Sequence, residues 1–303
     1  MKKSIFEKEW KALGTDIYVQ IVNDGILSRL EIERIFLEIS DIYIRQEKIF
    51  SRFEEESELS QINVHLGEFI EVSQEMLAIA EKSIEYFQES EEIFDPRILD
   101  VLEKIGYEKS FQKNNFEGAV ENIKEAGKRN LKEDLQIKKG KVKFLRRMDF
   151  SGIAKGYITD RIADFLCQKG FQNFLVDSGG DMYASGKDSE QDKWGIALEG
   201  SEDENKVILE LSDEAVATSG NVRKHWERNG RKFHHLINPH QPNYFSFDLQ
   251  SVTVVEKTAE KADFLAKYLF LLGLEKGIAL ANERGSRAFF LKANGEIIKS
   301  KHV

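Results

Sequence analysis

The spacing of apolar residues predicts where the helices of this chain lie. Between residues 27 and 50, isoleucines recur three or four positions apart, which places them on one face of a long amphipathic helix. Ser73 precedes a second run with helical spacing that continues to about Gln88, and Thr258 precedes a third that continues to about Leu272. Serine and threonine at such positions accept hydrogen bonds from the first free N–H groups of a helix, so both are predicted N-caps.

Alternation of apolar and polar residues predicts strands in the rest of the chain. Hairpins are expected to turn at Gly140 and at Asn229-Gly230. Strands are predicted over residues 12–22, 173–177, 194–199, 207–211, 215–219 and 249–256. An acidic turn is expected at 201–205, and a helix with a surface excursion at 108–133. Since helices are inserted irregularly among clustered strands, the pattern favours an α+β fold with mixed or antiparallel sheets over a doubly wound sheet.

A lysine and flanking glycines mark one segment as a candidate anion site. It reads DFSGIAKGYITDRIADFLCQKGFQNFLVDSGGD, from Asp149 to Asp181, and predicts a helix that opens near Ala154 and closes at Gly170. The first N–H groups of a helix have no partner within it and favour an anion, and Lys155 adds positive charge there. Phosphate is the natural ligand. The alternative is an ordinary helix with a lysine near its start, because neither a Walker nor a GxGxxG pattern is present.

The amino-acid composition of the chain restricts the kinds of function that it can have. The 303 residues carry a formal net charge of −9, which argues against nucleic acid as a partner. The single cysteine, Cys167, excludes an internal disulfide and is expected to be buried in helix packing. Neither a secretory signal nor a run of ~18 apolar residues is present. We therefore expect one cytoplasmic domain over residues 1–303 without membrane insertion, although a chain whose signal had been removed would read the same way.

Three other clusters carry residues suited to chemistry. They are Gly179-Gly180, Thr218-Ser219-Gly220 with His234-His235, and Asp263 with Lys267. Each also has a simpler structural explanation. The paired glycines fit a hairpin turn, the threonine segment fits a strand end, and a histidine on a strand is more often structural than catalytic. Asp263 and Lys267 lie four positions apart, as in an exposed helical ion pair worth about 0.2–0.5 kcal/mol.

Taken together and in this order, the motifs resemble one family. GIAKGYITD, LVDSGGD, VATSG, HLINP and AEKADFLAKYL are similar to the serial motifs of the bacterial FAD:protein FMN transferases, the ApbE family, as are SRFEEESELSQIN and FDP. The resemblance covers the chain from about Gly14 to Leu291. It implies a single α+β domain that binds FAD and a divalent metal, usually Mg²⁺, and transfers FMN from FAD to a threonine hydroxyl of an acceptor flavoprotein with release of AMP. Some members of the family hydrolyse FAD instead.

The resemblance also assigns roles to individual residues. His235 matches the family histidine that serves as general base, whereas His234 is not its equivalent. Lys155 faces the phosphates and is expected to take part in both binding and catalysis. Asp263 and the backbone carbonyl of Ala154 match the metal ligands. The flavin and nucleotide pocket is expected to be built by Lys155, Asn63, Asp95, Gly179, Gly180, Thr218, Ser219 and Gly220.

Lys267 departs from the family pattern. It stands where the family has a threonine whose hydroxyl binds the metal, and a charged ammonium has no lone pair to offer a cation. We expect its ammonium to take the place of the metal against Asp263 or the pyrophosphate, and Mg²⁺ to bind poorly. The alternative function is therefore a non-catalytic FAD-binding or partner-binding protein that has lost the metal site. An FAD pyrophosphatase would need the same metal.

Overall fold

The computed structural model describes residues 4–25, 27–107, 130–190, 192–200 and 207–303. Its centre is an eight-stranded sheet in which every neighbouring pair of strands is antiparallel. In spatial order the strands are β1 (Ser4–Ala12), β2 (Thr15–Asn23), β6 (Phe174–Ser178), β7 (Met182–Ser185), β10 (Glu214–Gly220), β13 (Leu249–Glu256), β14 (Arg287–Lys292) and β15 (Ile297–Lys299). The antiparallel sheet and its packed helices confirm the α+β prediction.

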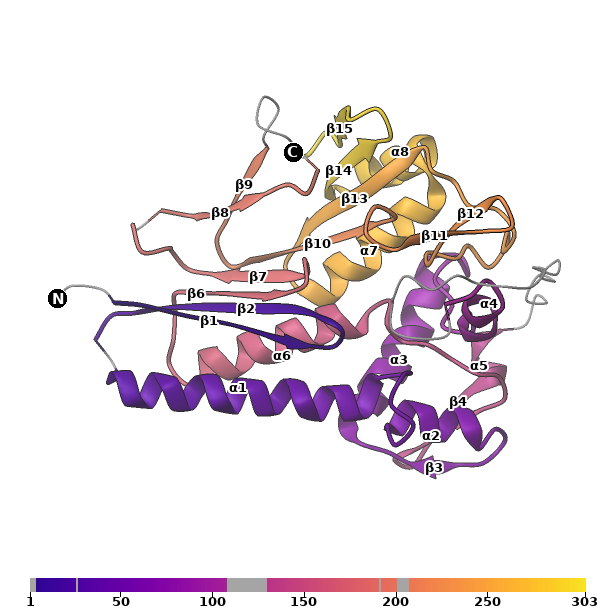
Figure 1. Cartoon of the computed structure of the whole chain (residues 1–303), viewed down its shortest axis with the longest axis horizontal. Coiled ribbons are helices and arrows are strands. Elements are labelled where there is room, and N and C mark those ends of the chain that lie inside the picture. The colour runs from indigo at the N-terminus through magenta and orange to yellow at the C-terminus, as the bar shows by residue number, and fades with distance from the viewer. Residues whose placement is uncertain (1–3, 26, 108–129, 191, 201–206) are drawn as a thin grey trace.

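Alternate residues of β2 face opposite sides of this sheet, as the pleat requires. Ile17, Val19 and Ile21 are fully buried in the larger core, which the helices complete. Val22 belongs to a second cluster on the other face, where it packs with residues of the hairpin β8 (Trp194–Ala197) and β9 (Ile208–Leu211). In Figure 1, helices α1 and α6 lie on one side of β1, β2, β6 and β7, and the β8–β9 hairpin lies on the other.

Four of the described helices pack against the main sheet and contribute to the larger core. They are α1 (Arg29–Phe50), α6 (Ala154–Gln168), α7 (Ala259–Leu272) and α8 (Leu274–Arg284). The predicted isoleucine face of α1 is buried, and Ser28 closes a capping box with Glu31 at its start. Helix α7 packs on β10 and β13 and crosses α6. The predicted cap Thr258 accepts a hydrogen bond from the Lys261 N–H, which confirms it.

A smaller set of elements lies beside the sheet, at the lower right of Figure 1. It contains α2 (Glu58–Val64), α3 (Gln74–Glu89), α4 (Leu99–Lys104), α5 (Leu131–Asp134) and the sheet of β3 (Ile70–Glu71), β5 (Lys141–Phe144) and β4 (Leu135–Lys138). The hairpin of β11 (His225–Arg228) and β12 (Arg231–His234) stands apart from the main sheet. Ser73 caps α3, and both predicted hairpin turns are present.

Two predictions from the sequence need correction. The strand expected over 12–22 is β2, which starts only at Thr15 because Leu13 and Gly14 both have positive φ and turn the chain between β1 and β2. Cys167 is exposed near the end of α6 rather than buried. Residues 108–129 and 201–205 lie outside the described residues, so the elements predicted there are not described. No helix in the described ranges combines the length and apolarity that a membrane crossing requires.

Candidate active site

The first turns of α6 and α7 are in close contact and are joined by hydrogen bonds. Gly156 lies against the start of α7 so closely that a Cβ there would stand 2.6 Å from the Ala259 carbonyl carbon. One turn further on, the Asp160 carboxylate accepts hydrogen bonds from the N–H groups of Ala259 and Glu260 at 2.7 and 2.9 Å. Burial raises the pKa of Asp160 to about 7, although these two hydrogen bonds oppose the shift. The contact fixes which side chains of the two helices meet.

Asp263 is the acidic residue at this junction. Its side chain projects from the second turn of α7 and is 5% exposed, and the Gly156 N–H donates to its Oδ2 at 3.4 Å. Burial and the nearby Asp181 carboxylate raise the pKa of Asp263 to about 7, whereas Lys155 and Lys267 act to lower it. A buried carboxylate in this position needs a positive charge beside it.

Lys155 supplies one such charge from the first turn of α6. Its ammonium forms an ion pair with the buried Asp181 carboxylate, which follows the Ser178–Gly180 turn. Burial acts to lower the pKa of Lys155, but the carboxylates of Asp181 and Asp263 outweigh it and the net shift is upward. Lys155 is therefore a fixed positive charge at the start of α6, as the sequence predicted.

Lys267 supplies a second charge from α7. Its Cε lies 3.3 Å from the position that a Cβ on Gly152 would occupy, and its Nζ lies closer still. The side chain therefore lies over the residues that lead into α6. Burial lowers the pKa of Lys267, and the carboxylates of Asp263 and Asp149 oppose that shift. The simple explanation of an exposed Asp263–Lys267 pair is wrong, because Asp263 is buried.

Lys224 is a third lysine at the site, and the sequence pattern did not reveal it. It lies just before β11, where burial together with the charges of Lys155 and Lys267 lowers its pKa to about 8. Its backbone carbonyl lies 3.4 Å from Nδ1 of His235. Only the folding of the β11–β12 hairpin brings Lys224 to the site, so no local spacing could have indicated it.

His235 and His234 lie in different surroundings. Burial and the charges of Lys224 and Lys267 hold the pKa of His235 well below its usual value, so its ring is neutral near pH 7. His234 packs its ring edge-on against Phe245, Phe247 and Phe270, and its Nε2 lies 3.1 Å from the Ser246 carbonyl. His234 is thus a core residue, while His235 lies among the lysines.

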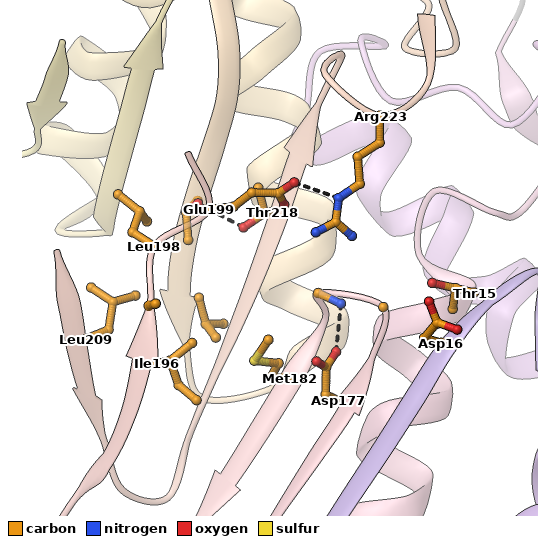
Figure 2. Close-up of a pocket in the computed structure, with 15 residues that line it drawn as sticks. Thr15, Asp16, Asp177, Met182, Ile196, Leu198, Glu199, Leu209, Thr218 and Arg223 are labelled. Atoms are coloured by element: carbon orange, nitrogen blue, oxygen red, sulfur yellow. Dashed lines mark hydrogen bonds and ion pairs between the residues drawn. The ribbon is translucent and has the colours of Figure 1, made fainter. Parts of the chain in front are cut away.

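A cavity of about 400 Å³ opens beside the Ser178–Gly180 turn (Figure 2). Its lining includes the predicted Gly179, Gly180 and Thr218, together with Thr15, Asp16, Asp177, Met182, Ile196, Leu198, Glu199, Leu209, Arg223 and Thr253. Gly179 has positive φ and leaves no room for a side chain against Thr15. Of the other predicted residues, Ser219 is buried, and a Cβ on Gly220 would lie 2.6 Å from the Gln250 carbonyl oxygen. These two residues do not line this cavity.

Asn63 holds the backbone that leads into α6, and Asp95 is held by a neighbouring arginine. The Asn63 amide donates to the Met148 carbonyl and accepts from the Met148 N–H, both at 2.8 Å. Asp95 forms a buried ion pair with Arg97 at 2.7 Å. Both side chains are satisfied by neighbouring protein groups, so a contact of either one with a cofactor stays a prediction.

The residues present do not fit a Mg²⁺ site. Among the described residues, no group of three or more His, Cys, Asp or Glu side chains is arranged to hold a metal ion. Mg²⁺ requires an octahedral set of oxygen ligands. Asp263 offers a carboxylate and the Ala154 carbonyl lies in the adjoining helix turn, but Lys267 brings a positive charge to the same place.

The sequence profile of the ApbE family matches residues 13–290 of this chain. The chain belongs to the ApbE family. An FAD:protein FMN transferase of Haemophilus influenzae is 29% identical over 304 residues, covering 96% of this chain and 88% of that protein. One of Vibrio cholerae is 38% identical over 137 residues, covering 44% of this chain and 41% of that protein.

Solved structures of ApbE proteins share the fold. The flavinyl transferase ApbE of Pseudomonas stutzeri, in its apo form, superposes with a TM-score of 0.84 at 25% identity and covers all of this chain and 96% of its own. The flavin transferase ApbE of Vibrio cholerae superposes with a TM-score of 0.82 at 23% identity, covering 99% of this chain and 98% of its own. Both superpositions extend over the sheet, the helices and the smaller elements beside them.

Proposed function

We propose that this ApbE protein is an FAD:protein FMN transferase that moves FMN from FAD to a threonine hydroxyl of an acceptor flavoprotein. The observation that carries the proposal is the position of His235, a neutral imidazole beside the lysines at the start of α6. Such a ring can accept a proton, and the lysines can hold the phosphates of a dinucleotide.

The chemistry is a displacement at phosphorus. The threonine oxygen forms a bond to the phosphorus of the FMN half, and the bond from that phosphorus to the bridging oxygen breaks, so AMP leaves with the oxygen. His235 takes the hydroxyl proton. Little covalent work is required of a protein in phosphoryl transfer, so positioning and neutralisation of charge supply most of the rate enhancement.

Two parts of the fold meet those requirements. The Lys155 ammonium at the start of α6 suits the pyrophosphate, whereas the N–H groups of Ala154 and Gly156 are already bonded to the Phe150 carbonyl and to Asp263. The cavity beside Gly179, Gly180 and Thr218 suits the remainder of FAD, because glycine backbone lets a ring approach closely. Asn63 and Asp95 take part by holding the segments around Met148 and Pro96.

A labelling reaction tests this function. The protein is incubated with FAD and a flavoprotein acceptor that carries the target threonine, and products are separated by chromatography. We expect AMP and flavin-labelled acceptor in equal amounts. AMP and free FMN without labelling would make the protein an FAD pyrophosphatase.

One observation favours a second candidate, a non-catalytic FAD-binding protein. Lys267 occupies the metal region, and the described residues include no metal-binding cluster. In that case FAD would bind and be recovered intact after prolonged incubation with the acceptor. The same reaction therefore separates the candidates.

A further inference from the structure

Three lysines from separate parts of the chain meet at the start of α6. Lys155 lies on α6, Lys267 on α7 and Lys224 before the β11–β12 hairpin. Their charges act on one another, since Lys155 and Lys267 both help to lower the pKa of Lys224. Like charges gathered in a buried region repel each other and lose hydration. Such an arrangement is stable only if an anion binds there or enough carboxylates balance it.

The carboxylates of this region balance its positive charges in number but do not pair with each of them. The carboxylates are Asp149, Asp177, Asp181 and Asp263, and the cations are Arg52, Lys155, Lys224 and Lys267. Asp149 is paired with the buried Arg52 guanidinium at 3.2 Å, and Asp181 is paired with Lys155. Asp263 is left to oppose Lys267. Asp181 and Asp149 act to raise the pKa of Lys224, but neither forms an ion pair with it. Among the described residues, neither the Lys224 nor the Lys267 ammonium is held in an ion pair, so both keep N–H donors for an anion.

Resting on the function proposed above, we propose that Lys224 and Lys267 supply the positive charge that a divalent cation would otherwise bring to the FAD pyrophosphate. The FAD pyrophosphate carries two negative charges, and two ammonium groups match them without a metal. Each ammonium also has three N–H donors for phosphate oxygens. FAD binding and FMN transfer then proceed in the absence of Mg²⁺.

Gly152 is the structural feature that admits Lys267. Its missing side chain leaves the space in which the lysine stem and ammonium lie, and Phe94 closes the other side, 3.2 Å from the position of a Cβ. Gly152 does not have a positive φ, so alanine is compatible with the backbone there. Gly152→Ala thus displaces the Lys267 ammonium without removing its charge.

Titration of FAD and riboflavin into the purified full chain tests the proposal. Dissociation constants are measured by flavin fluorescence with EDTA and with millimolar Mg²⁺. We expect the wild type to bind FAD equally well in both. Lys267→Met keeps the stem but removes the charge and should weaken FAD binding in EDTA by roughly 10- to 100-fold, the usual effect of losing a charge-assisted hydrogen bond. Riboflavin, which has no phosphate, should bind both proteins alike.

Matched variants distinguish the loss of a positive charge from an effect on folding. Lys224→Met should weaken FAD binding in the same way, and Gly152→Ala should do so to a smaller extent. Lys276→Met, at an exposed lysine of α8, should change nothing. Isothermal titration of Mg²⁺ into the FAD-bound proteins adds a readout independent of activity: no heat of binding is expected for the wild type, and Lys267→Thr should gain binding.

Two results would overturn the proposal. One is tighter binding of FAD by the wild type, by 10-fold or more, when Mg²⁺ replaces EDTA. The other is unchanged FAD affinity of Lys267→Met and Lys224→Met in EDTA. Failure of the proposed function would look different, because the wild type would then bind no FAD under either condition or would bind it without any transfer.

Discussion

Two adjacent histidines of this chain, at the end of β12 and just beyond it, lie in different surroundings. His234 lies among three phenylalanine rings, and burial lowers its pKa to about 4. His235 lies beside Lys224, and its lowered pKa leaves the ring neutral. The proposed function assigns chemistry to His235 and a structural role to His234.

Replacing His235 should affect chemistry and spare binding. We expect His235→Ala to bind FAD with nearly unchanged affinity and to lower the transfer rate by roughly 10²–10⁴, the usual contribution of a positioned acid or base. His234→Ala should instead lower the free energy of unfolding by about 1–3 kcal/mol, because it removes packed atoms and a buried hydrogen bond. Steady-state kinetics and thermal unfolding measure the two effects. A larger loss of rate at His234 would contradict the assignment of the base.

The pH dependence of kcat/KM should report the lowered pKa of His235 and of its neighbour Lys224. Its pKa is lowered, so the ring is neutral above that pKa, and activity should fall only when the pH drops well below the ordinary value of about 6.5. Lys224 has a pKa lowered to about 8, so a second decline is expected near pH 8 as it loses its charge.

Lys224→Met tests both limbs of this profile. It removes a positive neighbour of His235, which should move the acid limb to higher pH, and it should abolish the decline near pH 8. Lys276→Met should leave the profile unchanged. An acid limb at or above pH 6.5 in the wild type would show that His235 is not the base whose protonation is measured.

The contact between α6 and α7 is the element on which the site depends. Gly156 and Asp160 together hold the N-terminus of α7 against α6. This contact places Lys155 on one helix and Asp263 and Lys267 on the other within a single charged region. The hydrophobic pattern predicted both helices because each has its own apolar face, but it did not predict their contact.

A side chain added at this contact should lower both the free energy of unfolding and the affinity for FAD. Gly156→Ala places a Cβ 2.6 Å from the Ala259 carbonyl carbon and 2.7 Å from the Glu260 Cα. Backbone cannot move aside like a flexible side chain, so we expect a loss of about 1–3 kcal/mol in unfolding free energy and weaker FAD binding. Gly195→Ala, where the nearest atom is a side-chain carbon at 3.4 Å, is the control and should have little effect. Thermal unfolding and FAD titration measure both, and equal behaviour of the two variants would contradict the account of the contact.

At the edge of the sheet, the alternation of apolar and polar residues placed the start of a strand too early. Residues 12–22 alternate well enough to suggest one strand, yet Leu13 and Gly14 turn the chain back. Only glycine adopts such a backbone without strain, so a leucine at positive φ gives no signal in the sequence.

At the scale of the whole molecule, the site is assembled from segments that lie far apart in the sequence. The motif order pointed to Lys155, Asp263 and His235, and the structure brings all three into one charged region. The partners that set their charges were not predicted. Lys155 pairs with Asp181 across the sheet turn, and Lys224 arrives on a separate hairpin. Such pairings are products of tertiary packing and leave no periodicity in the sequence.

The most direct test of the central claim is FMN transfer measured by mass spectrometry in the presence of EDTA. The full chain is incubated with FAD and a threonine-bearing flavoprotein acceptor, with a second acceptor in which that threonine is replaced by alanine. We predict that the threonine acceptor gains the mass of FMN less one water, that AMP appears in equal amount, and that the alanine acceptor gains nothing. An acceptor whose mass is unchanged both with EDTA and with Mg²⁺, while FAD is bound, would contradict the claim.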